Sequence, residues 1–379
     1  MNLDFTETHT MIRDTARKFA EDKLAVSSVE RDEKEEFPHE AIKELGELGF
    51  MGMMVPEEWG GSGLDTISYV IAMEEISRVD ASVGVIMSVN NSLVCWGINH
   101  FGTDAQKKEY LRDLATGKKL GAFALSEPEA GSDASNQRTT ATRRGDVYLL
   151  NGTKNWITNG STADVVLVMA ATDPSKGPKG ISTFIVEKGT PGFSTGKKEK
   201  KLGIRSSDTV SLLFEDCPVP AANRIGEEGD GFKFAMKTLE GGRIGIAAQA
   251  LGIAQACLDA SVNYAKQRKA FDRPIAELQA IQFKIADMST NIEAARMLIL
   301  KAAATKDAGQ PFGAEAAMAK LFASRVAVQS ALEAIQIHGG YGYVREYLVE
   351  RYLRDAKITE IYEGTSEIQH VIIARSLLR

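Results

Sequence analysis

Two stretches with helical periodicity enclose a β-rich segment, and this change of pattern along the 379 residues most constrains the fold. Apolar residues recur every three or four positions near the N-terminus, at Ile12, Ala16, Phe19, Ala20 and Leu24. A heptad-like stripe near the C-terminus comprises Ile281, Ile285, Met288, Ile292, Ala295 and Ile299. We therefore expect an α+β fold with an α-helical domain over residues 1–118, a β domain over 119–229 and a helical bundle over 230–379.

Further helices are predicted in the N-terminal domain. Pro38 suits the first turn of one helix, and Asp65 suits the N-cap of another that runs towards Asp80. Their apolar faces comprise Ile42, Leu45 and Leu48 in the first and Val70, Met73 and Ile76 in the second. Between the two helices, residues 57–63 are expected to form a glycine-dense loop.

The middle domain is predicted to be an antiparallel β domain, because short β-rich runs alternate with turns and not with helices. Asn151–Gly152 is a strong hairpin signal, which would follow a strand over 147–150 and lead into another over 154–158. Further strands are expected over 165–169, 181–186 and 210–214.

Composition excludes several classes of function. The 45 basic and 51 acidic residues give a formal charge of −6 without a basic cluster, which makes nucleic acid a poor partner. The three cysteines form no CxxC pair and the five histidines no i, i+4 pair, so we expect neither a metal site nor a disulfide framework. The N-terminus lacks the features of a signal peptide, and no apolar run approaches the roughly 20 residues of a membrane helix. We expect a cytoplasmic protein without integral membrane association.

Two candidate functional segments lie in the middle domain, where the usual nucleotide-binding motifs are absent. Segment 123–133 runs from a strand into a Gly-Ser-Asp turn, whose amides and hydroxyls could hold a carbonyl-rich ring or a phosphate. An ordinary strand-to-loop transition is favoured on this segment alone. In segment 155–160, Trp156 and Thr158 on one strand face would offer an aromatic wall beside a hydroxyl, or equally a core Trp next to a surface Thr.

Two further candidate segments lie near the C-terminus. Residues 336–342 place three glycines where a helix ends; one would suffice as a cap, so a backbone approach to a ligand is slightly favoured. In segment 361–367, Glu363 precedes a helix that Thr365 or Ser366 can cap. A carboxylate in this bend could lie in an apolar cleft with a raised pKa, as a general base requires, although a solvated turn acid is far commoner.

In this order and spacing, the segments resemble the acyl-CoA dehydrogenase family of flavoproteins over nearly the whole chain. The marks of the resemblance are Leu125–Pro128 with Gly131–Asp133, Trp156–Thr158, Gln336–Gly340, Arg354–Ala356 and Ile361–Thr365. The resemblance implies a three-domain fold with an N-terminal α-helical domain, a middle antiparallel β domain and a C-terminal four-helix bundle.

The resemblance also implies a set of contacts to FAD. They comprise Phe123, Ala124, Leu125, Ser126, Ser132, Trp156, Ile157, Thr158, Arg268, Gln279, Gln336, Ile337, His338, Gly339, Gly340, Thr365, Ser366 and Glu367. Trp156 would shield one face of the flavin ring, and the Thr158 hydroxyl would lie near flavin N5. Arg268, Gln279 and the 336–340 turn match contacts made across a subunit interface, which implies a homotetramer built as a dimer of dimers.

Catalysis would fall to Glu363 on the same resemblance. Glu363 would take the α-proton of an acyl-CoA thioester while hydride leaves the β-carbon for flavin N5, giving a trans-2-enoyl-CoA. The Glu363 backbone N–H and a ribityl hydroxyl of FAD would polarise the thioester carbonyl. The implied substrate contacts are Ser132, Glu240, Gly241, Gly242, Arg243 and Gly364. Some relatives place the base immediately before the equivalent of Arg243, but that position here is Gly242, the second of two glycines at an expected helix start.

Substrate length and partners complete the expectations. Segment 84–93 looks most like short-chain, butyryl-CoA-type members of fatty-acid β-oxidation, and a short branched acyl-CoA is the alternative substrate. Electron-transferring flavoprotein would accept the electrons. The competing functions are an oxidase-type relative, such as an acyl-CoA oxidase or a nitroalkane oxidase with an aspartate base, and a cofactor-free helical scaffold. Glu363 argues against a nitroalkane oxidase, and Glu363 together with the intact flavin-contact segments argues against the scaffold.

Overall fold

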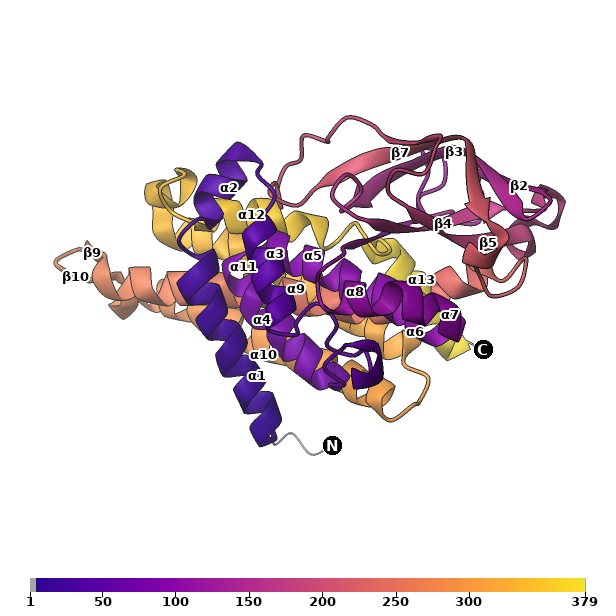
Figure 1. The fold of residues 1–379 in the computed structure, drawn as a ribbon. Coiled ribbons are helices and arrows are strands. Elements are labelled where there is room, and N and C mark those ends of the chain that lie inside the picture. Colours follow the sequence, from indigo (N-terminus) through magenta and orange to yellow (C-terminus); the bar gives the residue numbers. More distant parts are fainter. Residues whose placement is uncertain (1–4, 379) are drawn as a thin grey trace.

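The computed structural model describes residues 5–378 and sets a β domain against one end of a helical body (Figure 1). The N-terminal α-helices are α1 (Glu7–Phe19), α2 (Ser28–Lys34), α3 (His39–Glu47), α4 (Thr66–Val79), α5 (Ala81–Ser88), α6 (Trp96–Phe101), α7 (Asp104–Gln106) and α8 (Arg112–Ala115). Wider π-helical turns continue three of them, at η1 (Ala20–Leu24), η3 (Val89–Cys95) and η4 (Lys107–Leu111). A short 3₁₀ turn, η2 (Glu57–Trp59), begins the glycine-dense loop.

Side-chain caps fix the ends of the N-terminal helices. Thr6 accepts a hydrogen bond from the backbone of His9, whose ring accepts one from the backbone of Thr6, and this capping box starts α1. Asp65 accepts from the Ser68 N–H at 2.7 Å and caps α4, as predicted. The predicted apolar stripe, from Ile12 to Leu24, is buried on α1 and η1.

One predicted helix in this domain differs in detail. Pro38 is the N-cap of α3 and not a residue of its first turn. Ile42 and Leu45 are buried, but Leu48 is 42% exposed, so the prediction for Leu48 is wrong. The physical reason is that α3 ends at Glu47, which leaves Leu48 at the C-cap outside the buried face.

The middle domain holds one eight-stranded sheet in the order β6-β7-β3-β2-β4-β5-β8, with β1 paired to β4. Its strands are β1 (Gly121–Ala124), β2 (Thr140–Arg144), β3 (Val147–Thr158), β4 (Val165–Ala171), β5 (Ile181–Glu187), β6 (Phe193–Thr195), β7 (Thr209–Pro220) and β8 (Arg224–Ile225). Two 3₁₀ turns, η5 (Pro174–Gly180) and η6 (Ala221–Asn223), lie between strands. Most pairs are antiparallel, but β1 runs parallel to β4, so the sheet is mixed and not purely antiparallel.

The predicted hairpin at Asn151–Gly152 is wrong, because β3 continues through both residues. The register opposite β7 shifts between Leu150 and Gly152, which marks a bulge. The Asn151 amide exchanges two hydrogen bonds with Asp216 on β7, each of 2.9 Å, and so keeps the strands paired. The hairpin turn instead joins β2 to β3 at residues 145–146, where Gly145 has φ +62°.

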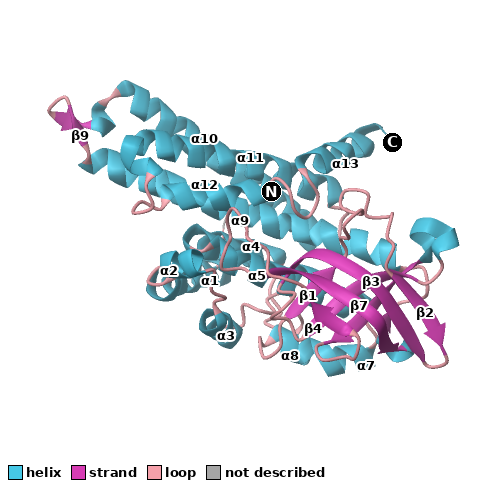
Figure 2. Ribbon diagram, turned by 90° about the horizontal axis from the view of Figure 1, so that it is seen from above, coloured by secondary structure: helices cyan, strands magenta, loops and turns pink. Residues whose placement is uncertain are grey.

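The C-terminal domain is built on long helices that run side by side towards the tip marked by β9 (Figure 2). Its elements are α9 (Gly231–Gln267), β9 (Lys269–Ala270), β10 (Arg273–Pro274), η7 (Ile275–Glu277), α10 (Gln279–Asp307), α11 (Gly313–His338), η8 (Gly339–Tyr343), α12 (Val349–Ile358) and α13 (Ser366–Leu378). The heptad-like stripe lies on α10, with Met288, Ile292, Ala295 and Ile299 buried and Ile281 and Ile285 partly buried.

Helix α9 is the central helix of this arrangement and starts earlier than expected. It begins at Gly231, so Gly241 and Gly242 lie in its interior and not at a helix start. It packs closely on α4: a Cβ at Gly252 would overlap the Glu74 carbonyl of α4 and lie 2.8 Å from the Arg78 backbone nitrogen. Glycine therefore lets α9 approach the backbone of α4.

Two helical stretches, Ala81–Phe101 and Gly231–Gln267, are long and apolar enough to cross a membrane by length and composition alone. Both are largely buried inside the protein, as core helices are. The expectation that no apolar run reaches this length therefore needs correction.

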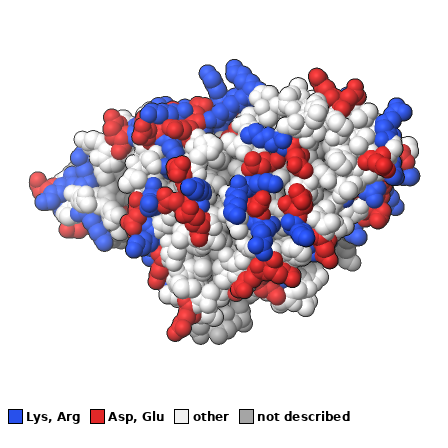
Figure 3. All heavy atoms as spheres, viewed as in Figure 1, with Lys and Arg blue, Asp and Glu red and all other residues white. Residues whose placement is uncertain are grey.

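Basic and acidic side chains are mixed over the face in Figure 3.

Candidate active site

The turn between α12 and α13 carries Glu363 in an unusual backbone conformation. Glu363 has φ +52° and Gly364 has φ +95°, so two consecutive residues adopt the left-handed region. A backbone hydrogen bond of 3.0 Å from Ser366 N–H to the Glu360 carbonyl closes the turn. Among residues 5–378, the Glu363 N–H donates to no backbone or side-chain acceptor. The turn thus presents a carboxylate together with a free backbone donor.

Glu363 as a whole is half-buried, but one oxygen of its carboxylate is shielded from solvent. Its Oε2 atom is buried without a hydrogen-bond partner among the described residues. A Cβ at Gly242 would overlap this oxygen and would lie 2.8 Å from Cδ2 of Leu93. Burial raises the pKa of Glu363 to about 7, although the positive charges of Lys320 and Arg243 lower it. Such a carboxyl group can exchange a proton near neutral pH.

Beyond Gly242, the same face of α9 meets hydroxyl and amide groups. A Cβ at Gly245 would lie 2.5 Å from both the Tyr69 and the Ser88 hydroxyl oxygens. Tyr69 donates to Ser88 at 3.1 Å. One turn further along, Gln249 accepts from the Tyr362 hydroxyl and donates to the Ala81 carbonyl at 2.7 Å. These polar side chains bound the space next to Glu363.

The two candidate segments of the β domain lie together. The Asn155 N–H donates to the Ser126 carbonyl at 2.9 Å, which joins the segment after β1 to β3. At Trp156 the backbone has φ +62°, the register opposite β7 is interrupted, and the indole is 64% exposed. Trp156 is therefore not a core residue. Ile157 is buried and Thr158 is half-buried on the same strand.

A buried ion pair supports this surface from beneath. Lys154 Nζ donates to Glu127 at 2.7 Å, to the Leu125 carbonyl at 3.1 Å and to Gln137 at 3.1 Å. Burial lowers the pKa of Lys154 to about 8, while Glu127 opposes that change. Phe123, Ala124 and Leu125 are buried beside it, whereas Ser126 is half-buried and Ser132 is exposed. Sequence reasoning did not single out Lys154.

A second group of predicted contacts lies at the opposite end of the molecule. Arg268 and Gln279 flank the β9–β10 hairpin, which forms the tip far from the β domain in Figure 1. The Arg268 guanidinium lies 5.3 Å from the centre of the Tyr341 ring in η8, next to the 336–340 turn. Cβ atoms at Gly339 and Gly340 would meet nothing within 4 Å. Within one chain the structure does not bring this group near Trp156.

The remaining predicted residues surround the Glu363 turn. Arg243 is buried on α9, its Nε has no partner within the described part of the chain, and burial lowers its pKa. Glu240, one turn earlier, pairs with Lys237 at 3.2 Å. The Thr365 hydroxyl accepts from the Ile368 N–H at 3.4 Å at the start of α13. The Ser366 hydroxyl is buried and finds no partner between residues 5 and 378, and Glu367 is exposed.

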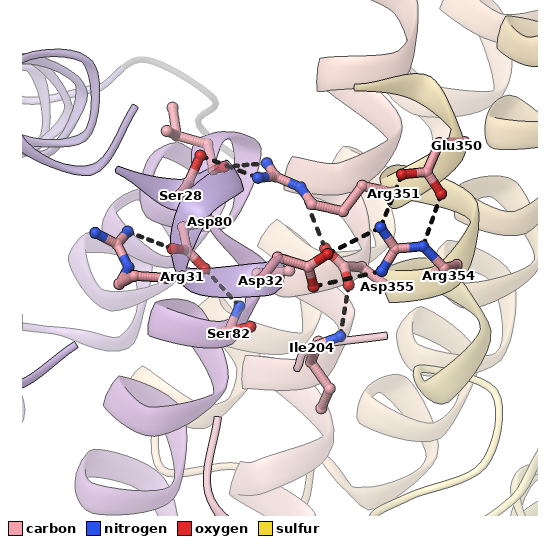
Figure 4. A network of polar contacts seen from close by, with 12 residues as sticks. Ser28, Arg31, Asp32, Asp80, Ser82, Ile204, Glu350, Arg351, Arg354 and Asp355 are labelled. Carbon is pink, nitrogen blue, oxygen red and sulfur yellow. Dashed lines mark hydrogen bonds and ion pairs between the residues drawn. The ribbon is translucent and has the colours of Figure 1, made fainter. Parts of the chain in front are cut away.

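Arg354 and Asp355, which belong to the Arg354–Ala356 motif, connect three parts of the chain (Figure 4). Arg354 pairs with Asp32 of α2 at 2.9 Å and with Glu350 at 2.7 Å. Asp355 accepts from the Ile204 N–H of the β domain at 2.5 Å. Because α12 leads into the Glu363 turn, this network fixes the β domain relative to the turn.

Comparison with known proteins identifies the family. Profiles for acyl-CoA dehydrogenases match along the chain: the N-terminal domain over residues 6–118, the middle domain over 122–217 and the C-terminal domain over 229–378. The chain belongs to the acyl-CoA dehydrogenase family. The short-chain specific acyl-CoA dehydrogenase of Rattus norvegicus mitochondria is 55% identical over 378 residues, which is all of this chain and 92% of that protein.

Comparison with solved structures agrees with this assignment. Butyryl-CoA dehydrogenase from Megasphaera elsdenii superposes with a TM-score of 0.99 at 52% identity, covering 100% of both chains. A chain from a structure described as the electron transferring flavoprotein of Acidaminococcus fermentans gives the same score, identity and coverage. The three-domain fold expected from the sequence is confirmed.

Acyl-CoA dehydrogenases are FAD-dependent oxidoreductases, and FAD is the cofactor of this chain. The residues present fit FAD. The fold itself leaves the Trp156 indole uncovered beside the Thr158 hydroxyl, as a platform for a planar ring requires. At the far tip, the exposed Arg268 guanidinium supplies a positive charge, and the open space around Gly339 and Gly340 lets a group approach the backbone.

Proposed function

We propose that this acyl-CoA dehydrogenase oxidises a short-chain acyl-CoA to its trans-2-enoyl-CoA, with Glu363 as the base that removes the α-proton. The observation that carries this proposal is the buried, unpartnered Oε2 of Glu363 in a turn whose N–H is also free. A thioester carbonyl that accepts from this N–H would place its α-carbon beside the carboxylate. The same donor would stabilise the enolate that forms as the proton leaves.

Bound FAD supplies the acceptor for the hydride that leaves the β-carbon. The chain's own residues orient the reaction: Ser126, Trp156 and Thr158 would hold the flavin ring, and Arg243 would contact the CoA portion of the substrate. Burial of the Glu363 Oε2 atom strengthens the carboxylate as a base, because a poorly solvated anion gains most from taking a proton.

A short acyl chain is supported by the α9 face beside Glu363. A chain that starts at the thioester and follows this face meets the Tyr69 and Ser88 hydroxyls at the level of Gly245. It then meets Gln249, which is 0% exposed and hydrogen-bonded to Tyr362 and Ala81. Displacing these satisfied polar groups with methylenes would be unfavourable, which favours butyryl-CoA over longer substrates.

We further propose a homotetramer, a dimer of dimers, in which the tip of one chain completes the FAD site of another. Arg268, Gln279 and the 336–340 turn lie far from Trp156 in one chain, so they can share one FAD with Trp156 only across an interface. Electron-transferring flavoprotein is the proposed electron acceptor, in keeping with the Acidaminococcus fermentans structure. The free, buried cysteines Cys95, Cys217 and Cys257 fit a reducing compartment, and we place the protein in the cytoplasm.

Anaerobic stopped-flow mixing of the holo-protein with acyl-CoA from C4 to C16 tests the proposal. Butyryl-CoA should bleach the flavin absorbance fastest, and Glu363→Gln should slow bleaching by about 10²–10⁴-fold while FAD content stays unchanged. Glu360→Gln, in the same turn but paired with Lys357, is the matched control and should bleach normally. Bleaching of Glu363→Gln at the rate of the unmodified protein would place the base elsewhere.

A further inference from the structure

The backbone of the Glu363 turn is held from outside by two buried side chains. The left-handed conformation of Glu363 is disfavoured for a residue with a Cβ and persists only where surrounding contacts maintain it. The Gly364 carbonyl accepts from Lys320 Nζ at 2.6 Å and from Gln369 Nε2 at 2.8 Å. Lys320 lies on α11 and Gln369 on α13, so the turn is fixed to two different helices.

Burying a lysine so that it can donate a hydrogen bond to a carbonyl costs free energy. Lys320 is 0% exposed, and among residues 5–378 it forms no ion pair within 4.0 Å. Burial lowers its pKa to about 8, and the nearby charge of Glu363 is the largest influence that opposes this. A neutral amide could donate to the same carbonyl without the cost of burying a charge. The presence of lysine at this position therefore indicates that its positive charge has a role beyond the hydrogen bond.

The charged groups around Glu363 come from several elements. Lys320 on α11 and Arg243 on α9 are the cations that lower its pKa, and Lys320 is the larger influence. The neighbouring titratable side chains are Tyr69 on α4, Tyr362 in the turn, Glu240 beside Arg243, and Glu360 and Glu367 beside Lys320. Of these two cations, Lys320 is the one that also donates a hydrogen bond to the turn that carries the carboxylate.

We propose that Lys320 is a positioning residue for Glu363: its ammonium group holds the Gly364 carbonyl, and so the left-handed turn, and supplies a positive charge at neutral pH that favours the ionised carboxylate. This inference rests on the proposed function, in which Glu363 is the base. It assigns two separable effects to one side chain, a hydrogen bond that sets the geometry of the turn and a charge that sets the pH range of the reaction.

Substitutions on the FAD-loaded protein separate the two effects. Lys320→Met removes both, and Lys320→Gln keeps a donor but removes the charge. The readout is the rate of flavin bleaching by butyryl-CoA in anaerobic single turnover, measured from pH 5.5 to 9.5. We expect Lys320→Met to lose at least about tenfold in rate at pH 7 and to shift the half-maximal pH upward by about one unit, because an opposite charge was lost. Lys320→Gln should show the same shift in pH with a smaller loss of maximal rate.

The matched control is Arg325→Met on the same helix. Arg325 is exposed and reaches α13 through His370 at 2.8 Å without touching the Glu363 turn, so its pH profile should be unchanged. A pH profile of folded Lys320→Gln that coincides with that of the unmodified protein would overturn the proposal, even if its rate were lower. The role of Glu363 is tested separately: if butyryl-CoA bleaches the flavin of the unmodified protein but not that of Glu363→Gln, Glu363 is the base. If no acyl-CoA bleaches the unmodified protein, the proposed function fails and this inference fails with it.

Discussion

A side chain at Gly242 would collide with the carboxylate of Glu363, although 121 residues separate the two in sequence (363 − 242). The Cβ of any other residue at this position of α9 would overlap Oε2 and come within 2.8 Å of Leu93. Two positions of the chain therefore open onto one small volume, and only one of them can fill it. Here Glu363 fills it, and Gly242 keeps it free.

Gly242→Ala should therefore displace the Glu363 carboxylate. We expect a loss of at least about tenfold in the rate of flavin bleaching by butyryl-CoA, since a misplacement of about 1 Å can cost roughly 10²-fold. Gly241→Ala is the matched control, because its Cβ would make an ordinary contact with Lys306 Nζ at 3.7 Å and should cost much less. Equal rates for the two variants would show that the overlap is relieved without moving the carboxylate.

The pH dependence of bleaching should report the ionisation of Glu363. Only the carboxylate form can accept the α-proton, and burial raises its pKa to about 7. The rate should therefore be low at pH 5.5, rise with a midpoint near 7 and level off above about pH 8. Photochemical reduction of the same flavin needs no base and should not follow this curve. A midpoint near that of a solvated glutamate, about 4.3, would contradict the buried environment.

Sequence periodicity predicted most of the fold because burial of apolar stripes is a local property. The stripe from Ile12 to Leu24 and most of the α10 stripe are buried as expected, and Asp65 caps α4. The Asn151–Gly152 hairpin could not be predicted correctly, because the pairing of Asn151 with Asp216 on β7 overrides the local turn preference. Long-range strand pairing is not encoded in a dipeptide.

The candidate site could be predicted only in part. Trp156, Thr158 and Glu363 lie in motifs that the resemblance singled out, and the structure places the first two on β3 and Glu363 in the turn between α12 and α13. Lys320 lies 43 residues before Glu363 in an ordinary helix, with no motif around it (363 − 320). Its importance becomes visible only when the fold brings its ammonium group to the Gly364 carbonyl. The only local signal in the sequence that could have drawn attention to Lys320 is a lysine within an Ala-rich stretch.

The network in Figure 4 should contribute to stability through Arg354. Arg354→Met would leave Asp32, which is buried on α2, without its partner at 2.9 Å. Breaking a buried ion pair in this way typically costs about 3–5 kcal/mol, so the apparent Tm of the holo-protein should fall by several degrees. Lys34→Met, in an exposed pair with Glu30 on the same helix, should leave the Tm unchanged. A Tm for Arg354→Met equal to that of Lys34→Met would show that the network does not stabilise the fold.

Gln249 should set the length of acyl chain that the protein accepts. It is buried on the α9 face that also carries Gly242 and Gly245, and its two hydrogen bonds, to Tyr362 and Ala81, close that face beyond Glu363. Gln249→Ala removes the amide, which opens space but leaves the Tyr362 hydroxyl unpaired. We expect the preferred substrate in a C4 to C16 panel to move from C4 to C6 or C8, with a loss of about 1–3 kcal/mol in stability from the unpaired hydroxyl.

Gln255→Ala, on the same helix but hydrogen-bonded to Asp259 and Arg296 away from Glu363, should keep the original preference. The measurement is kcat/KM for each acyl-CoA with an artificial electron acceptor. An unchanged order of substrates in Gln249→Ala would mean that the length limit lies elsewhere, and the Tyr69 and Ser88 hydroxyls opposite Gly245 would then be the next positions to substitute.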